Sequence, residues 1–289
     1  MQFLRDLFGQ KRPAPAQVSQ PPSEAVRTLP RLQVGWATDV GEVRRHNEDM
    51  ALVITAAHDG NDALPAFGLF ILADGMGGHQ AGEVASSLAV RTVAYQVIRR
   101  LYLPILIGQD QGSEWPTLHE VLVDAVQAAN SAVAEQVPGG GTTLTCALVI
   151  GSQAYIAHVG DSRAYIVTEA GLDQITHDHS LVDRLVELGQ LTRDEAANHP
   201  QKNVLYRAVG QSGTLEVDTY VRAIPPGGRL LLCSDGLWGL VSEAEMTRIV
   251  MTTSSLQVAC ESLVAAANRA GGRDNITAIL VEPPPGQSR

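Results

Sequence analysis

Four aspartates stand in sequence settings that suit the binding of divalent cations. Asp74, Asp161 and Asp235 each follow a hydrophobic run and have a glycine directly beside them. Asp274 comes just before another hydrophobic run, at residues 276–281. A carboxylate at the end of a strand is held by a rigid sheet, and a neighbouring glycine lets a ligand or a second backbone approach closely. Mg²⁺ and Mn²⁺ prefer oxygen ligands of this kind, so the four aspartates are candidate metal ligands.

Each of these motifs alone also fits a tight turn, because Asp-Gly is a common hairpin sequence. Asp59 is interpreted as such a turn, since polar residues surround it and strand-like runs flank it. Asp74 differs because a periodic helical run follows it, whereas Asp161 stays ambiguous because residues 160–163 also fit a plain hairpin tip. Several carboxylates in one place repel one another unless cations bind between them. A shared site for these aspartates would therefore be a metal site.

Six short motifs occur in order along the chain. They are residues 43–49 (VRRHNED), 73–79 (ADGMGGH), 141–144 (GTTL), 160–163 (GDSR), 233–237 (CSDGL) and 273–277 (RDNIT). In this order they resemble the bacterial branch of the metal-dependent serine/threonine protein phosphatases of type 2C. The resemblance covers about residues 32–281, nearly everything except the N-terminal tail. Any single motif is weak, whereas six in order are highly specific.

The resemblance implies a metal-binding role for each aspartate. Asp74 would bridge two ions, and the carbonyl oxygen of Gly75 would contribute to one of them. Asp235 and Asp274 would complete the same two-ion site, and Asp161 would hold a third, weaker ion. The implied cofactor is Mn²⁺ or Mg²⁺, with two or three ions.

Three further residues have implied roles beside the ions. Arg44 would hold the substrate phosphate, because a guanidinium offers a planar set of donors to phosphate oxygens. Glu48 and Asp49 would act through metal-bound water. The implied nucleophile is a water between two cations, which loses a proton near neutral pH, and the same ions neutralise charge on the transferred phosphoryl group. Arg45 is interpreted as a solvated surface charge.

The chain departs from the family pattern at Met76. Some members have a histidine there as a proposed proton donor to the leaving group, so the general acid is expected to be metal-bound water and is not assigned to His79. His177 and His179 have the spacing of a zinc-binding pair but lack further ligands nearby. They are interpreted as loop residues that open a flap at about residues 177–211. This flap resembles the mobile segment associated with substrate choice in the family.

The elements that must hold these residues are predicted from hydrophobic periodicity. Strands are expected at residues 32–38, 50–57, 66–73, 142–150, 153–159, 164–168, 229–233 and 276–281, and helices at 83–99, 118–136, 180–188, 243–251 and 256–269. The strands come in clusters, which favours antiparallel sheets with helices outside over a doubly wound parallel sheet. The resemblance implies the same α+β class, with two packed antiparallel sheets flanked by helix pairs on both outer faces.

Three segments are expected along the chain. Residues 1–31 combine a short amphipathic helix with a proline-rich flexible tail, and this helix either frays or docks a partner or membrane surface. Residues 32–282 form the catalytic domain, in which residues 108–116 are a surface loop between two helices. Residues 283–289 form a C-terminal tail.

The amino-acid composition limits the classes of function that this chain can have. The 289-residue chain is 45% hydrophobic with a net charge of −10, which fits a globular protein and argues against a nucleic-acid partner. No apolar run reaches the length of a transmembrane segment, and the N-terminus lacks the pattern of a signal peptide, so a cytoplasmic location is expected. The three cysteines have no metal-binding spacing and are predicted to be buried and reduced.

The resemblance implies that the protein hydrolyses phosphoserine and phosphothreonine in substrates of serine/threonine kinases by means of metal-activated water. A cysteine phosphatase is excluded, because it needs Arg six positions after Cys, and positions 152, 239 and 266 hold Ser, Gly and Ala. One alternative is a catalytically silent, phosphatase-like binding module, although none of the expected metal carboxylates is missing. The other is a histidine-kinase/Hsp90-type ATP-binding domain around residues 74–78. That alternative needs a glycine-rich lid, for which only residues 139–141 are available.

Overall fold

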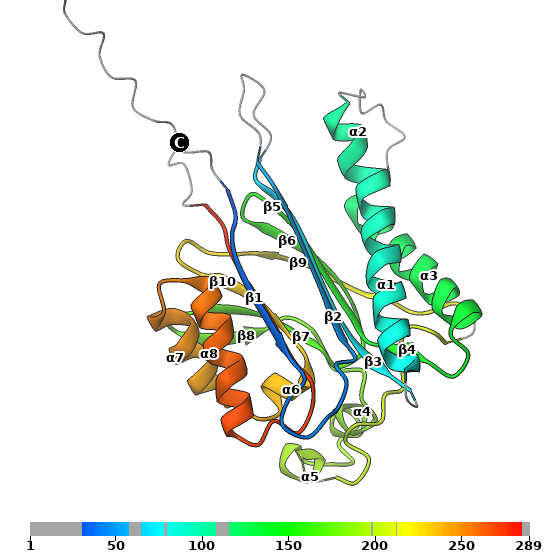
Figure 1. Ribbon diagram of the computed structural model, residues 1–289, viewed down its shortest axis with the longest axis vertical. Helices are drawn as coiled ribbons and strands as arrows, with labels where there is room; N and C mark the ends of the chain where they lie inside the picture. The colour runs from blue at the N-terminus through cyan, green and yellow to red at the C-terminus, as the bar shows by residue number, and fades with distance from the viewer. Residues whose placement is uncertain are drawn as a thin grey trace, which may run out of the picture.

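Two antiparallel sheets lie at the centre of the molecule, and helices cover their outer faces (Figure 1). The computed structural model describes residues 31–57, 65–77, 80–107, 116–197, 199–211 and 213–284. The predicted α+β architecture is confirmed. Within the described ranges, no helix combines the length and the apolar character that a membrane span requires.

Every strand pair in the two sheets is antiparallel. The first sheet has the order β1 (Gln33–Asp39), β11 (Ile276–Glu282), β10 (Arg229–Cys233), β7 (Arg163–Thr168) and β8 (Gly171–Gln174). The second has the order β2 (Asp49–Ala56), β3 (Phe67–Met76), β5 (Leu144–Ile150), β6 (Gln153–Val159) and β9 (Asp218–Ala223), and the short β4 (Gly141–Thr142) pairs with the end of β3.

One helix pair packs on each outer face, and three short helices lie at one end of the sheets (Figure 1). The pair α1 (Ala81–Val97) and α3 (Leu118–Gln136) covers the second sheet, and a π-helical turn (Ile98–Tyr102) continues α1 into α2 (Leu103–Leu106). The pair α7 (Glu243–Thr252) and α8 (Leu256–Arg269) covers the first sheet. The short helices are α4 (Leu181–Glu187), α5 (Arg193–Ala197) and α6 (Asp235–Trp238).

The central strands are buried on both faces, which explains why they read as unbroken apolar runs in the sequence. In β3, Leu69 and Ile71 pack beneath α1 and α3, whereas Phe70 and Leu72 face the first sheet. In the same way, Leu232 of β10 lies between the sheets. These packed strands carry the aspartates that follow them to one common end of the molecule.

Most predicted elements are present, and the misses have physical reasons. The strand predicted at residues 142–150 is interrupted at Thr143, which instead exchanges hydrogen bonds with the backbone of Asp74. The strand β9 was missed because it lies at a sheet edge and is half-exposed to exposed, without a clear apolar alternation. The helices α5 and α6 are too short to show helical periodicity.

Some predictions fall outside the described residues and stay predictions. They concern the N-terminal helix and most of the tail (residues 1–30), the turn at Asp59, the residue His79, nearly all of the loop at 108–116, and residues 285–289.

Candidate metal centre

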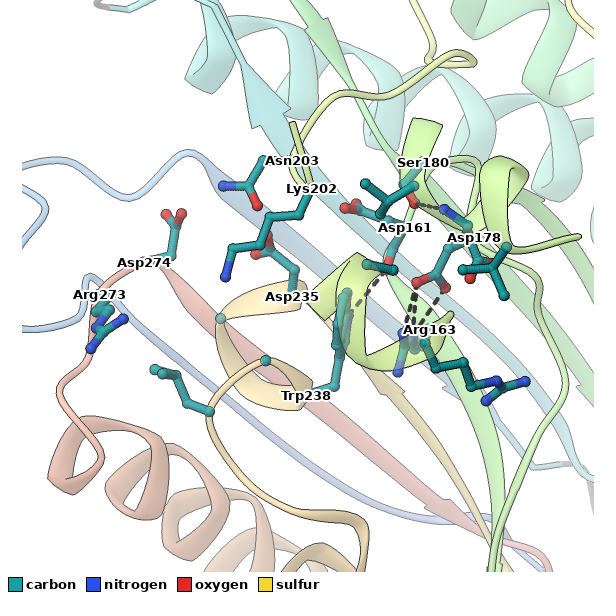
Figure 2. A pocket seen from close by; sticks show the side chains of 18 of the residues that line it. Asp161, Arg163, Asp178, Ser180, Lys202, Asn203, Asp235, Trp238, Arg273 and Asp274 are labelled. Atoms are coloured by element: carbon teal, nitrogen blue, oxygen red, sulfur yellow. Dashed lines mark hydrogen bonds and ion pairs between the residues drawn. The ribbon is translucent and has the colours of Figure 1, made fainter. Parts of the chain in front are cut away.

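Five carboxylates from separate parts of the chain meet at one end of the two sheets, and we call them the carboxylate centre. They are Asp49 at the start of β2, Asp74 near the end of β3, Asp161 after β6, Asp235 at the start of α6, and Asp274 before β11. Three of them, Asp161, Asp235 and Asp274, line a cavity of about 670 Å³ (Figure 2). The structure thus brings together all four aspartates that were predicted to bind metal.

Asp74 is held by its neighbours in the sheet and by two threonines. Its backbone N–H donates to Thr143 Oγ1 (2.9 Å), and its carbonyl oxygen accepts from Thr143 N (2.8 Å) and Thr142 Oγ1 (2.8 Å). A Cβ added at Gly75 would lie 2.2 Å from the carbonyl oxygen of Gly82 and 2.7 Å from that of Glu48, so only glycine fits there. Thr142 and Thr143 of the GTTL motif therefore hold the backbone of Asp74 in place. The sequence alone did not indicate a role for this motif.

Two buried carboxylate oxygens in this centre have no hydrogen-bond partner among the described residues, namely Asp49 Oδ1 and Asp235 Oδ1. The other oxygen of Asp49 accepts from Ser234 Oγ (2.8 Å) and Thr277 Oγ1 (2.7 Å). A buried polar atom without a partner is costly. A cation is the natural partner for oxygens that face several other carboxylates, so the donor set fits divalent metal.

The environment of the centre disfavours ionised carboxylates. Burial, opposed by hydrogen bonds from Thr277 and Ser234, raises the pKa of Asp49 to about 7. Burial and then the charge of Asp235 raise the pKa of Asp161 to about 8. Burial and then the charge of Asp274 raise the pKa of Asp235 to about 6, and burial followed by the charge of Asp49 raises that of Asp74 well above its usual value. Cations at this site would relieve the repulsion that contributes to these shifts.

Asp274 is turned toward Arg44, the residue that was predicted to hold phosphate. Arg44 Nη2 donates to Asp274 Oδ2 at 2.6 Å, and Asp274 Oδ1 accepts from the N–H of Asn275 at 2.9 Å. Within the described ranges, no three Asp, Glu, His or Cys side chains are gathered closely enough around one point to hold an ion. Arg44 and the N–H of Asn275 therefore hold the Asp274 carboxylate in this structure.

Glu48 and Asn275 organise the wall beside α1. The N–H of Glu48 donates to Asn275 Oδ1 (2.8 Å), and Ser86 Oγ donates to the carbonyl oxygen of Glu48 (2.7 Å). The Asn275 amide nitrogen donates to the carbonyl oxygens of Val40 (3.0 Å) and His46 (2.9 Å). Asn275 therefore holds the segment before β2 in place, which is a role that the sequence reading did not give it.

A stacked tryptophan supports the backbone of Asp161. Trp238 Nε1 donates to the carbonyl oxygen of Asp161 at 3.1 Å. The guanidinium of Arg163 lies 3.5 Å from the centre of the Trp238 ring and pairs with Asp178 at 2.8 Å (Figure 2). Since Trp238 belongs to α6, which begins at Asp235, this contact ties two of the carboxylates to each other. The sequence offered no signal for it beyond the presence of the residues.

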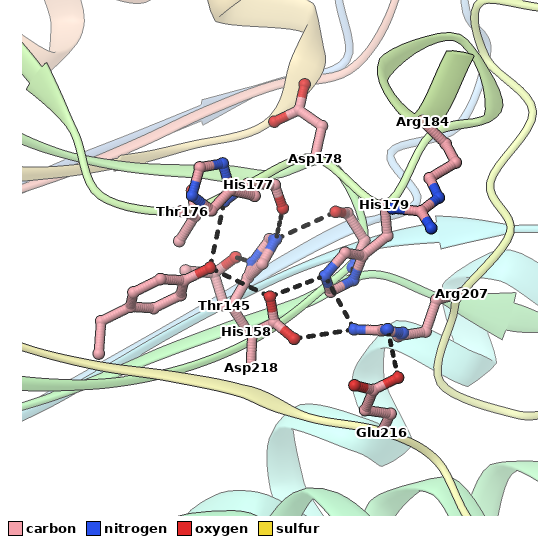
Figure 3. Close-up of polar contacts among 12 residues, drawn as sticks. Thr145, His158, Thr176, His177, Asp178, His179, Arg184, Arg207, Glu216 and Asp218 are labelled. Carbon is pink, nitrogen blue, oxygen red and sulfur yellow. Dashed lines mark hydrogen bonds and ion pairs between the residues drawn. The ribbon is translucent and has the colours of Figure 1, made fainter. Parts of the chain in front are cut away.

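A second polar cluster joins both ends of the flap to the second sheet, and we call it the flap-base network (Figure 3). It consists of His158, His179, Arg207, Asp218 and Tyr220. Asp218 accepts from His179 Nε2 (3.3 Å), Arg207 Nη1 (2.8 Å) and the Tyr220 hydroxyl (3.1 Å). His179 is buried and accepts from the N–H of Gly160 at Nδ1 (3.0 Å). His179 therefore serves as a structural link, and within the described residues it is not gathered with His177 and further ligands into a metal site.

Burial determines the charge state of the two histidines in this network. It lowers the pKa of His158 to about 3 and also lowers the pKa of His179. The neutral His158 ring accepts from Thr145 Oγ1 at Nδ1 (2.9 Å), and its Nε2 proton points to the carbonyl oxygens of Gly160 and His177 (both 3.0 Å). The residue before Asp161 is thus contacted by both histidines.

Known proteins resemble this chain along most of its length. A family model described as Protein phosphatase 2C matches residues 51–269. The serine/threonine phosphatase stp of Listeria innocua is 41% identical over 253 residues, which cover 87% of this chain and 96% of the relative. The solved serine/threonine phosphatase of S. agalactiae has a TM-score of 0.73 at 33% identity, covering 87% of this chain and 99% of that one. The catalytic domain of serine threonine protein phosphatase PstP, solved with two manganese ions, has a TM-score of 0.68 at 34% identity, covering 88% and 99%.

Proposed function

This chain belongs to the protein phosphatase 2C family and is a metal-dependent serine/threonine protein phosphatase, and we propose that the carboxylate centre is its catalytic site. One observation carries the proposal. Four of the six motifs contribute residues to one cavity, and in the carboxylate centre beside it the buried Oδ1 atoms of Asp49 and Asp235 lack hydrogen-bond partners among the described residues. A structural role alone would not explain buried carboxylate oxygens left without partners beside this cavity.

We propose that Asp74, Asp235 and Asp274, with the carbonyl oxygen of Gly75, hold two Mn²⁺ or Mg²⁺ ions and that Asp161 holds a third. The close packing of Gly75 and the raised pKa values of Asp74 and Asp235 support this assignment. The two manganese ions of the related PstP domain support the number and the kind of ion. Bound cations supply a water nucleophile at neutral pH and neutralise charge on the phosphoryl group.

The protein's own side chains would orient the substrate. Arg44 is half exposed at the cavity, where its guanidinium can leave Asp274 and bind phosphate oxygens when a cation neutralises that carboxylate. Glu48 and Asp49 remain predicted to act through water. Asp49 lies opposite Asp74 in the register of β2 and β3, which supports its role. Met76 packs near Gly141 and cannot donate a proton, so metal-bound water remains the proposed general acid for the leaving group.

The substrates proposed are phosphorylated proteins, including products of serine/threonine kinases. We propose that the enzyme acts in the cytoplasm, which the three unpaired cysteine thiols support. No observation favours the silent binding module, because the full set of predicted carboxylates is present. The ATP-binding alternative loses its only candidate lid, since Gly141 pairs with Met76 between β4 and β3.

The test is phosphate release from a phosphothreonine peptide by the purified full chain, measured against Mn²⁺ concentration and then after EDTA. Saturable release that depends on Mn²⁺ and stops with EDTA is the expected result. If folded protein releases no phosphate at any Mn²⁺ or Mg²⁺ concentration, the proposal is wrong and the catalytically silent binding module is favoured.

A further inference from the structure

The cavity continues beyond the carboxylate centre into a compartment beneath the flap. Its apolar wall is formed by Val182 and Val186 of α4, Ala196 of α5, and Trp238 and Leu240 on the opposite side. A phosphate group alone does not need this compartment, because Arg44 and the carboxylates already lie at the other end. The compartment is therefore placed to receive residues on either side of the phosphorylated residue.

The charged lining of the cavity contains five acids and five bases, and two of the bases are in ion pairs with acids of the lining. Arg163 pairs with Asp178 at 2.8 Å, and Arg44 pairs with Asp274 at 2.6 Å. Burial raises the pKa of Asp183, and the charge of nearby Arg193 opposes that rise. The five acids are Asp161, Asp178, Asp183, Asp235 and Asp274, and the five bases are Arg44, Arg163, Arg193, Lys202 and Arg273.

Two bases of the lining, Lys202 and Arg273, lie beside the carboxylate centre and, like Arg193, have no ion-pair partner in the part of the chain that the structure describes. Both are exposed, and they come from different segments. Lys202 follows α5 in the flap, and Arg273 directly precedes Asp274. In Figure 2 the Lys202 side chain reaches over Asp235, while Arg273 lies beyond Asp274. They therefore border the carboxylate centre on two sides.

Occupation of the centre by divalent cations would give the lining of the cavity a surplus of positive charge. Each ion adds two positive charges to a lining whose own acids and bases are equal in number. Arg44 then leaves Asp274 for the substrate phosphate, which still leaves Lys202 and Arg273 without an anion. A positive cavity in a chain of net charge −10 attracts anionic ligands selectively to that one place.

We propose that Lys202 and Arg273 make the enzyme prefer phosphoproteins with a second anionic group close to the phosphorylated residue. That group is an acidic side chain or a second phosphate, since both are bound by lysine and arginine through the same chemistry. The proposal rests on the proposed function, because it concerns the substrate of the same site.

The test compares three phosphothreonine peptides of equal length. The first has neutral residues on both sides of the phosphothreonine, and the second has Asp and Glu there. The third has a second phosphothreonine two residues away from the first. For the wild-type chain with Mn²⁺ at low salt, kcat/KM is expected to be about tenfold higher for the two anionic peptides. In Lys202→Gln and Arg273→Gln this ratio falls to about threefold, and in the double variant to about one. Arg222→Gln, in an exposed arginine of β9 outside the cavity, keeps the wild-type ratio.

Two kinetic results would overturn the proposal. One is equal kcat/KM for the neutral and anionic peptides in the wild-type chain. The other is an equal loss on all three peptides in the variants, which would mean that the two bases act on the reacting phosphate. If the wild-type chain prefers only one of the two anionic peptides and the variants lose that preference, the proposal holds. The preferred peptide then shows whether the second anionic group is an acidic side chain or a second phosphate.

A binding measurement separates failure of this inference from failure of the proposed function. Fluorescence anisotropy with non-hydrolysable phosphonate versions of the same peptides, in the presence of Mn²⁺, needs no turnover. Tighter binding of the anionic peptides that Lys202→Gln and Arg273→Gln weaken would support the inference even if no phosphate is released. Equal binding of all three peptides to the wild-type chain would refute it.

Discussion

The carboxylate centre and the flap-base network are both polar and largely buried, yet they differ in how their polar atoms are satisfied. In the network, Asp218 accepts hydrogen bonds from three donors and both ring nitrogens of His158 and His179 have partners. In the centre, by contrast, Asp49 Oδ1 and Asp235 Oδ1 are buried without a partner among the described residues. The network carries matched positive and negative groups, whereas the centre gathers charges of one sign.

This difference separates a scaffold from a binding site. A network in which each donor meets an acceptor rigidifies the structure and requires nothing further. A cluster of like charges with unsatisfied oxygens costs free energy until a ligand of opposite charge arrives. The two regions meet at residues 160 and 161, so the scaffold holds the backbone from which one of the candidate ligands projects.

The largest expected effect is the loss of activity in the centre. Asp274→Ala should lower kcat/KM on a phosphothreonine peptide by at least about 10³-fold, equivalent to about 4 kcal/mol, because it removes a metal ligand. The free energy of unfolding without metal should change by less than about 1 kcal/mol, since the Arg44 pair that it breaks is exposed. Urea titration in EDTA measures the second quantity, and substantial residual turnover would refute the metal assignment.

A smaller effect, on stability, is expected in the network. His158→Phe removes the hydrogen bonds of the buried ring to the Thr145 hydroxyl and to the carbonyl oxygens of Gly160 and His177, although the Gly160 carbonyl still accepts from the N–H of His179. The free energy of unfolding should fall by about 1–3 kcal/mol, measured by urea titration. The exposed His119 provides a matched control, and His119→Phe should change stability by less than about 0.5 kcal/mol. Equal effects of the two substitutions would contradict the contrast between the regions.

The two regions should also respond oppositely to pH in the metal-free protein. Burial raises the pKa of Asp49 to about 7 and that of Asp161 to about 8, so these groups cost stability as pH rises from about 4 to about 8. Burial lowers the pKa of His158 to about 3, so it costs stability only as pH falls below about 6.5. Between pH 6.5 and 8 the carboxylates dominate.

We therefore expect the melting temperature in EDTA to fall between pH 6.5 and 8, and saturating Mn²⁺ to remove that fall. Asp161→Asn should make the fall in EDTA shallower, because one raised pKa is gone. A melting temperature in EDTA that is constant or rises over this interval would contradict the assignment of repulsion to the centre.

The smallest effect concerns the tryptophan beneath Asp161. Trp238→Phe keeps an aromatic ring for Arg163 but removes the N–H that donates to the Asp161 carbonyl oxygen. We expect the Mn²⁺ concentration for half-maximal activity to rise by about 3- to 10-fold, as for other residues that orient metal ligands. Trp36→Phe, in a half-exposed tryptophan of β1, should leave that concentration unchanged. If the Mn²⁺ concentration for half-maximal activity is the same in the two variants, Trp238 has no part in positioning Asp161 for metal binding.

The sequence predicted the central strands well, and it singled out four aspartates that the structure brings together, because both leave strong local patterns. Strands buried on both faces, such as β3, read as apolar runs, and Asp74 follows such a run directly. The short helix α6 and the edge strand β9 leave no comparable pattern, since few of their residues are buried in a periodic way.

The contacts that position the site could not be predicted from the sequence, because they join residues that are far apart along the chain. Trp238 and Asp161 are 77 positions apart, and Arg207 meets Asp218 and His179 only because the flap folds back on itself. The role of Asn275 is similar, since its amide spans 227 positions to reach Glu48. Hydrogen-bond partners of this kind depend on the packing of the sheets, which periodicity does not specify.

The carboxylate centre is proposed to bind divalent cations, whose charge no side chain of the centre replaces. The most direct test is the melting temperature of the wild-type chain and of Asp74→Asn, each measured in EDTA and in saturating Mn²⁺ at pH 7.5. Mn²⁺ is expected to raise the melting temperature of the wild-type chain, whereas Asp74→Asn is expected to melt higher than wild type in EDTA and to gain little from Mn²⁺. An equal gain from Mn²⁺ in both proteins, or no gain in the wild-type chain, would contradict this proposal.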